Sequence, residues 1–256
     1  MDSQAAARRT SPPVLDSGAP DFGARLRALG FPLAADAVAF DLDGTLLDTA
    51  EDLAWAANAM LAELGHAALP VATIRDFVGK GLPNLVRRSL AAASGAEPEE
   101  ALMARATDIS RRFYRDRLCV DTRPFPGVVE GLEALRGAGY PMAVVTNKPE
   151  EFTVPLVEQV GLADYFGLVI GGDTLPRKKP DPLPLTHAAA HFGVPPARLL
   201  MVGDSANDTL AARAAACPVF CVPYGYSEGI DVRTLDCDAI VASLCDVPRL
   251  IHKSHP

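Results

Sequence analysis

Two aspartates, Asp41 and Asp43, are the residues of this 256-residue chain whose types and spacing most clearly suggest chemistry. They follow an apolar run and precede Gly44 and Thr45. The hydroxyl of Thr45 can lie beside exposed backbone N–H groups and bind phosphate. Two ionised carboxylates in a closed cleft are costly without a cation, and Mg²⁺ prefers carboxylate and phosphate oxygens. One acid can then attack phosphorus while the other moves a proton. The same residues are also compatible with a strand that ends in an acidic turn.

Polar groups also follow later apolar runs of the chain. Thr146 and Asn147 are compact hydrogen-bond donors that can hold a phosphoryl oxygen without adding charge. Lys179, the last of three consecutive cations and directly before Pro180, can stabilise phosphoryl oxygens in a transition state. Asp204 can supply a second metal carboxylate, and Asp208 can orient Lys179 or a metal-bound water. Each group alone also suits ordinary turn, surface-loop or helix-capping chemistry, but their order on successive strand ends favours one joint site.

These motifs resemble the signatures of the haloacid-dehalogenase-like (HAD) phosphatases over about residues 36–247. The matching segments are D-x-D-G-T-L-x-D at 41–48, Thr146 at a strand end, K-P-x-P at 179–182 and G-D-S-A-N-D at 203–208. The resemblance implies that Asp41 is the nucleophile and forms an aspartyl-phosphate. It also implies that Asp43 protonates the leaving alcohol, activates water and gives its backbone oxygen to Mg²⁺. Asp41 and Asp204 would provide side-chain oxygens to the same ion, and Thr146 and Lys179 would complete the catalytic set.

The elements that must position these residues indicate an α/β fold. Apolar runs at 37–40, 141–146, 168–170, 199–202, 219–222 and 239–241 alternate with helical segments, which predicts a doubly wound, Rossmann-like parallel sheet formed by residues 35–48 and 124–256. Residues 49–123 are rich in alanine and leucine with helical periodicity, so we expect an inserted all-helical domain, which in this family is a mobile cap. Residues 1–34 are expected to form a flexible extension with a short helix around 24–29.

The segment V-G-K-G-L-P at 78–83 is the most unusual part of the expected cap. Gly79 and Gly81 flank Lys80 and expose a cation before a helix, where it can bind a small carboxylate, although a plain interhelical turn has the same composition. The segment resembles the cap loop of phosphoglycolate phosphatases. We therefore expect a Mg²⁺-dependent phosphatase that acts on a small phosphorylated metabolite, with 2-phosphoglycolate the leading substrate and Thr45, Asn147 and Lys80 as substrate-binding residues.

Other functions on the same core stay open. A phosphosugar mutase would use the same nucleophile, and the phosphonoacetaldehyde hydrolases of this superfamily form a Schiff base with a cap lysine. Retention of Asp43 favours ester hydrolysis and disfavours a 2-haloacid dehalogenase, since that class lacks the second acid. A non-catalytic phosphate-binding or regulatory module would bind phosphate without turnover.

Composition excludes several broader classes. The formal net charge is −8 with no basic run, so we expect no nucleic-acid partner, and no apolar segment is long enough to suggest a membrane span. Five cysteines without a C-x-x-C pair indicate neither a disulfide framework nor a zinc ribbon. Reduced thiols favour a cytoplasmic protein, and either a monomer or a homodimer is compatible with the sequence.

Overall fold

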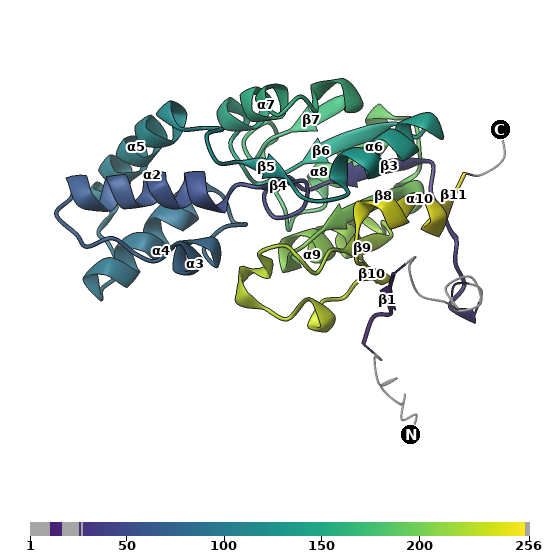
Figure 1. The fold of residues 1–256 in the computed structure, drawn as a ribbon, viewed down its shortest axis with the longest axis horizontal. Coiled ribbons are helices and arrows are strands. Elements are labelled where there is room, and N and C mark those ends of the chain that lie inside the picture. Colours follow the sequence, from purple (N-terminus) through teal and green to yellow (C-terminus); the bar gives the residue numbers. More distant parts are fainter. Residues whose placement is uncertain (1–10, 17–25, 27, 254–256) are drawn as a thin grey trace.

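The computed structural model, shown in Figure 1, describes residues 11–16, 26 and 28–253. Its centre is a seven-stranded sheet in the order β1-β10-β9-β8-β3-β6-β7, in which every neighbouring pair is parallel. The strands are β1 (Val14–Leu15), β3 (Ala37–Phe40), β6 (Met142–Val145), β7 (Leu168–Ile170), β8 (Leu199–Gly203), β9 (Val219–Cys221) and β10 (Ala239–Val241). The predicted doubly wound α/β fold is confirmed.

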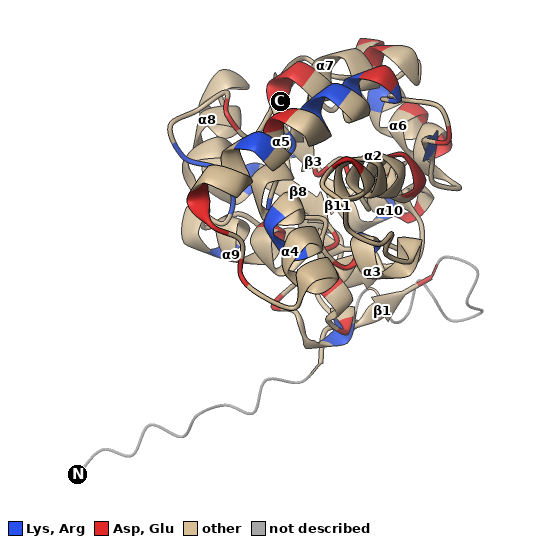
Figure 2. Ribbon diagram, turned by 90° about the vertical axis from the view of Figure 1, so that its left-hand side faces the viewer, with Lys and Arg blue, Asp and Glu red and all other residues tan. Residues whose placement is uncertain are grey.

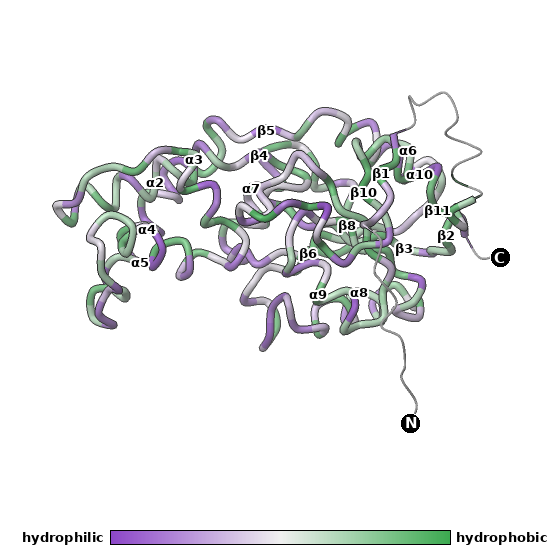
Figure 3. Tube along the Cα trace, turned by 90° about the horizontal axis from the view of Figure 1, so that it is seen from below, coloured by the Kyte–Doolittle hydropathy of each residue, from purple (hydrophilic) through white to green (hydrophobic). Residues whose placement is uncertain are grey.

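Helices cover both faces of the sheet because successive strand residues point to opposite sides. Val38 and Phe40 of β3 belong to an apolar cluster that includes α6 (Val128–Gly137), α7 (Glu150–Gln159) and α10 (Val247–Leu250). Ala37 and Ala39 face a second cluster with α8 (Leu183–His191) and α9 (Ala206–Ala215). The strands β3 and β8 lie among the hydrophobic segments of the core, coloured green in Figure 3. This burial on both faces explains why the strands read as continuous apolar runs.

The helical insert follows β3 and forms the end of the molecule on the left of Figure 1. It contains α2 (Ala50–Glu63), α3 (Val71–Arg75), α4 (Leu82–Ser94) and α5 (Glu100–Asp116), and α2 packs against the other three. The insert is joined to the core by two antiparallel strands, β4 (Leu47–Asp48) and β5 (Arg123–Pro124). The segment that enters the cap and the segment that leaves it therefore lie side by side, paired as β4 and β5.

Parts of the region expected to be a flexible extension belong to the core instead. The strand β1 pairs with β10 at the edge of the sheet, and Leu15 is buried. The strand β2 (Leu33–Ala34) pairs with β11 (Ile251–His252), close to the buried Phe31. Residues 1–10, 17–25 and 27 of the extension expected at 1–34 lie outside the described residues, and with them half of the short helix expected around 24–29.

The surface of the described part carries mixed charge. Of the cap helices that face the viewer in Figure 2, α2 carries only acidic charges, α4 only basic ones and α5 both. Among the described residues, none of the helices is both long and apolar enough to cross a membrane.

Candidate active site

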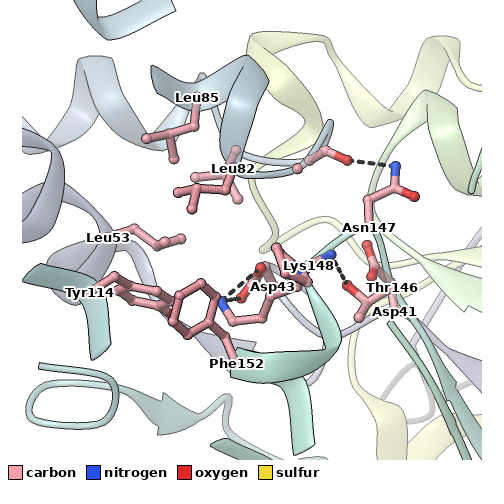
Figure 4. Close-up of a pocket in the computed structure, with 14 residues that line it drawn as sticks. Asp41, Asp43, Leu53, Leu82, Leu85, Tyr114, Thr146, Asn147, Lys148 and Phe152 are labelled. Atoms are coloured by element: carbon pink, nitrogen blue, oxygen red, sulfur yellow. Dashed lines mark hydrogen bonds and ion pairs between the residues drawn. The ribbon is translucent and has the colours of Figure 1, made fainter. Parts of the chain in front are cut away.

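The ends of three neighbouring strands bring the predicted site residues to one edge of the sheet. Asp41 and Asp43 follow β3, Thr146 and Asn147 follow β6, and Asp204 follows β8. All of these but Asp204 line a cavity between cap and core. Figure 4 shows the polar groups on the core side of this cavity, while Leu53, Leu82 and Leu85 of the cap line its other side. Its wall also includes Val78, Gly79, Gly81, Tyr114, Lys148, Pro149 and Phe152.

Asp41 is held beside a buried cation. The Nζ atom of Lys179 lies 3.0 Å from Asp41 Oδ1, and both side chains are almost fully buried. Burial raises the pKa of Asp41 to about 6 even though the neighbouring Lys179 charge lowers it. Lys179 also donates to Asp208 Oδ1 at 2.6 Å and to the Val145 carbonyl at 2.6 Å, so all three of its hydrogens are used.

Asp208 is fixed by the helix that follows β8. Its Oδ2 atom accepts hydrogen bonds from the backbone N–H groups of Asp204 and Ser205 and from the Ser205 hydroxyl, which forms a capping box at the start of α9. With Oδ1 taken by Lys179, both oxygens already have partners. Asp208 therefore orients Lys179 and stabilises the turn that carries Asp204.

Three carboxylates, from Asp41, Asp204 and Asp208, offer oxygen atoms within 4.8 Å of one another, and all three are buried. Burial, with the charges of Asp208 and Asp41, raises the pKa of Asp204 to about 7. The backbone leaves no room for larger side chains here, since a Cβ atom on Gly44 would lie 2.6 Å from Asp204 Oδ2. Crowded, buried carboxylate oxygens are the donor set of a hard divalent cation, so these residues fit a metal ion.

Thr45 lies next to Asp204 rather than on the cavity wall. Its buried hydroxyl donates to Asp204 Oδ1 at 3.1 Å. The other Asp204 oxygen accepts from the backbone N–H groups of Tyr226 and Ser227, at 2.6 and 3.1 Å. The residues 226–227 were not anticipated, because nothing in the sequence signals a contact between segments 22 residues apart that meet only in the fold.

Asp43 points toward the cap side of the cavity. It accepts a hydrogen bond from the Thr49 hydroxyl at 2.8 Å and pairs with Lys148 Nζ at 3.0 Å (Figure 4). The sequence analysis assigned no role to Lys148. The available signal was its position directly after Thr146 and Asn147, which makes it the third polar residue at the end of one strand.

Asn147 links the cap to the loop that carries Lys179. Its Nδ2 group donates to the Gly79 carbonyl of the cap at 3.0 Å and to the Lys179 carbonyl at 2.9 Å. Gly81 makes this approach possible: it has a φ of +85°, and a Cβ atom there would lie 3.0 Å from the Asn147 carbonyl oxygen.

Lys80 does not line the cavity. Its Nζ atom forms an ion pair with Glu228 Oε2 at 2.6 Å, and its side chain is 51% exposed. Glu228 also accepts from Asn207 Nδ2 at 2.6 Å. Lys80 therefore joins the cap to the core, and in this arrangement it lies outside the wall of the cavity.

Comparison with known proteins agrees with this geometry. The family model of the haloacid dehalogenase-like hydrolases matches residues 35–216. A phosphoglycolate phosphatase from Nitrosospira multiformis is 57% identical over 224 residues, which cover 88% of this chain and 99% of that protein. A phosphoglycolate phosphatase from Thiobacillus denitrificans is 54% identical over the same shares of both chains.

Among solved structures, a predicted phosphoglycolate phosphatase from Haemophilus somnus has a similar fold. Its TM-score is 0.79 at 33% sequence identity, with 83% of this chain and 96% of that chain covered. The family match extends over most of the chain and includes Asp41, Thr146, Lys179 and Asp204. The chain belongs to the haloacid dehalogenase-like hydrolases.

Proposed function

We propose that this protein is a Mg²⁺-dependent phosphatase that hydrolyses 2-phosphoglycolate to glycolate and phosphate through an aspartyl-phosphate on Asp41. The observation that carries the proposal is a buried Asp41 carboxylate at a cavity wall, paired with Lys179 and flanked by a second acid, Asp43. The substrate is inferred from the relatives of highest identity described above, which are phosphoglycolate phosphatases.

In the first step, an Oδ atom of Asp41 attacks phosphorus while the bond between phosphorus and the ester oxygen breaks. Thr146 lies in the cavity wall, so its hydroxyl can donate to a phosphoryl oxygen, and the positive charge of Lys179 beside Asp41 stabilises the negative charge that builds on these oxygens. Protonated Asp43 gives its proton to the leaving oxygen, which departs as the hydroxyl of glycolate. The product is an acyl phosphate on Asp41.

In the second step, water hydrolyses this acyl phosphate. Asp43, now ionised, takes a proton from the water as its oxygen bonds to phosphorus, and the bond between phosphorus and Asp41 breaks. Phosphate leaves and Asp43 is again protonated. The apolar cap residues Leu53, Leu82 and Leu85 restrict the access of bulk water to this end of the cavity.

The side chains of Asp41 and Asp204, which belong to the buried carboxylate cluster, would hold a magnesium ion together with the backbone carbonyl of Asp43. Asp208 lies in the same cluster, where it orients Lys179 and caps α9. When bound, the ion supplies positive charge that allows carboxylates and a phosphoryl group to share one site.

A panel of phosphate esters, assayed with Mg²⁺ and with EDTA, tests the proposal. We expect 2-phosphoglycolate to have the highest kcat/KM, EDTA to abolish turnover, and Asp41→Asn to lower kcat at least about 10³-fold while the protein stays folded. Retained activity in Asp41→Asn, or faster turnover of sugar phosphates than of 2-phosphoglycolate, would refute it.

A further inference from the structure

We propose that Lys148 recognises the substrate carboxylate and thereby sets the preference for a carboxylated phosphate ester. This inference rests on the proposed function, since it concerns the non-reacting end of the same substrate. It assigns a specificity role to a residue of the core, at the end of β6, and not to a cation of the cap.

Lys148 is a buried cation in the cavity wall. Only 4% of the residue is exposed, and it lines the cavity together with Asp41 and Asp43. Its Nζ atom lies 3.0 and 3.2 Å from the two oxygens of Asp43 and 4.6 Å from the centre of the Tyr114 ring. A buried ammonium is costly unless paired, so these contacts hold it at a defined position beside the cavity.

Other lysines near the site are committed elsewhere. Lys179 uses its three hydrogens on Asp41, Asp208 and the Val145 carbonyl. Lys80 pairs with Glu228 and lies outside the cavity wall. Lys148 is thus the one cation that lines this cavity among the residues the structure describes.

Lys148 has hydrogen-bonding capacity left for a ligand. An ammonium group offers three hydrogens, whereas within the described residues the side-chain acceptors found for Lys148 Nζ belong to the single carboxylate of Asp43. Asp43 takes at most two of these hydrogens, so the third is left for a second carboxylate on the cavity side, in exchange for the contact with the Tyr114 ring.

The position of Lys148 matches the length of the substrate. In 2-phosphoglycolate one CH₂ group separates the ester oxygen from the carboxylate. With phosphorus at Asp41 and the ester oxygen at Asp43, the carboxylate comes next to the partner of Asp43, which is Lys148. Beyond that point the wall is formed by apolar side chains such as Leu53, Leu82 and Phe152, which offer a carboxylate no hydrogen bond (Figure 4).

A role limited to neutralising Asp43 makes a different prediction. In that case loss of the Lys148 charge would slow all phosphate esters by a similar factor. A carboxylate-binding role instead changes the ratio between two substrates that differ only in that group. Ethyl phosphate is the matched probe, because a methyl group replaces the carboxylate of 2-phosphoglycolate.

The test compares kcat/KM for these two substrates in the wild type, Lys148→Met and Lys80→Met. We expect Lys148→Met to lower the ratio of 2-phosphoglycolate to ethyl phosphate about 10–100-fold, mainly through KM, as loss of a hydrogen bond between charged groups predicts. Lys80→Met, a matched loss of charge in the cap, should change both values by the same factor and leave the ratio within about twofold.

Lys148→Gln covers the case in which the methionine variant does not fold, since its amide can still donate to Asp43 while the charge is lost. The inference would be overturned by an unchanged ratio of the two kcat/KM values in a folded Lys148 variant, or by a lower ratio in Lys80→Met. Neither result would contradict the proposed phosphatase activity. A wild type that prefers ethyl phosphate over 2-phosphoglycolate would overturn both.

Discussion

At the scale of single residues, the site is a set of carboxylates placed closer together than their charges favour. Asp41, Asp204 and Asp208 are buried within a few ångströms of one another, and one cation, Lys179, lies among them. Burial raises the pKa of Asp41 to about 6 and that of Asp204 to about 7. The metal-free protein therefore carries an unfavourable charge distribution that a divalent ion relieves.

This crowding predicts a pH-dependent stability of the metal-free protein. A carboxyl group whose folded pKa is raised above its unfolded value favours folding while protonated, and that stability is present below the unfolded pKa, near 3.8. It is lost as the pH rises through the folded values of about 6 and about 7. In EDTA we expect the Tm to fall by roughly 5 °C or more between pH 5 and pH 8.

Magnesium should reverse the trend, because it binds the ionised carboxylates and so stabilises the folded protein more at pH 8 than at pH 5. Differential scanning calorimetry with Mg²⁺ and with EDTA measures both effects. Asp204→Asn should flatten the profile in EDTA; an equally steep profile in that variant would show that other groups cause it.

At the scale of elements, the cap is held in place by contacts that the sequence does not signal. Asp52 of α2 is fully buried and accepts hydrogen bonds from the backbone N–H groups of residues 120–122, from the Thr122 hydroxyl and from Arg117. This carboxylate fixes the segment that returns from α5 to β5. From the sequence, it resembles only an acid in the first turn of a helix.

We expect Asp52→Asn to destabilise the protein by about 2–4 kcal/mol, since an amide cannot replace a buried carboxylate with this many donors. Urea unfolding followed by circular dichroism measures the change. Asp121→Asn is the control, because that side chain is half-exposed and its loss should cost about 1 kcal/mol or less. Similar losses in both variants would contradict the structural role of Asp52.

The close approach of cap and core at Gly81 gives a second prediction at this scale. Alanine at Gly81 adds a Cβ atom 2.9 Å from Lys178 Nζ and 3.0 Å from the Asn147 carbonyl oxygen, at a φ of +85°. Gly95 has a similar φ of +76° but no atom within 4 Å of the added Cβ, which makes it a matched control.

Both alanine variants should lose about 1 kcal/mol of stability from the positive φ. Only Gly81→Ala should also lower kcat/KM, by about tenfold or more, because it separates the cap loop from Asn147. Steady-state kinetics on the two variants measure this difference. Equal kcat/KM values would show that the contact between the cap loop and Asn147 is not needed for turnover.

The same scale shows what the sequence can and cannot predict. The strands β3, β6 and β8 were predicted because each is a run of apolar residues that is buried on both faces. The strands β1, β2 and β11 have two residues each, too few for a periodic pattern, and they form only by pairing with a strand far along the chain. The helix α3 was not anticipated either, because its five residues are too few to show a helical period.

The site divides in a similar way. Asp41, Thr146 and Asp204 could be brought together from the sequence, because the carboxyl ends of parallel strands share one edge. The pairing of Lys148 with Asp43, 105 residues apart, depends on how the ends of two core strands pack together, and that of Lys80 with Glu228 depends on how the cap docks on the core. Side-chain partners of this kind follow from tertiary packing and not from local pattern.

At the scale of the whole molecule, cap and core share one apolar cluster. It runs from strand residues such as Phe40 through Leu46 and Leu47, next to the connection between core and cap, to Leu53 and Tyr114 of the cap. Trp55, the single tryptophan of the chain, lies on α2 with its ring 5.8 Å from that of Phe113. Its fluorescence therefore reports on the cap, while far-ultraviolet circular dichroism reports on the whole protein.

We expect the two signals to give coincident urea unfolding transitions, because a continuous apolar cluster couples the two parts. An earlier transition by fluorescence would show that the cap unfolds independently. Asp52→Asn provides a comparison, since weakening the cap alone should separate the two curves.

The central claim is that Asp41 receives the phosphoryl group, and an acid-quenched reaction tests it most directly. Wild-type protein, mixed with 2-phosphoglycolate and Mg²⁺ and quenched within one turnover, is digested and analysed by mass spectrometry. The account predicts one added phosphoryl group on the peptide that contains Asp41, at that residue, and none in Asp41→Asn. A phosphoryl group on any other residue, or turnover that continues in Asp41→Asn, would contradict it.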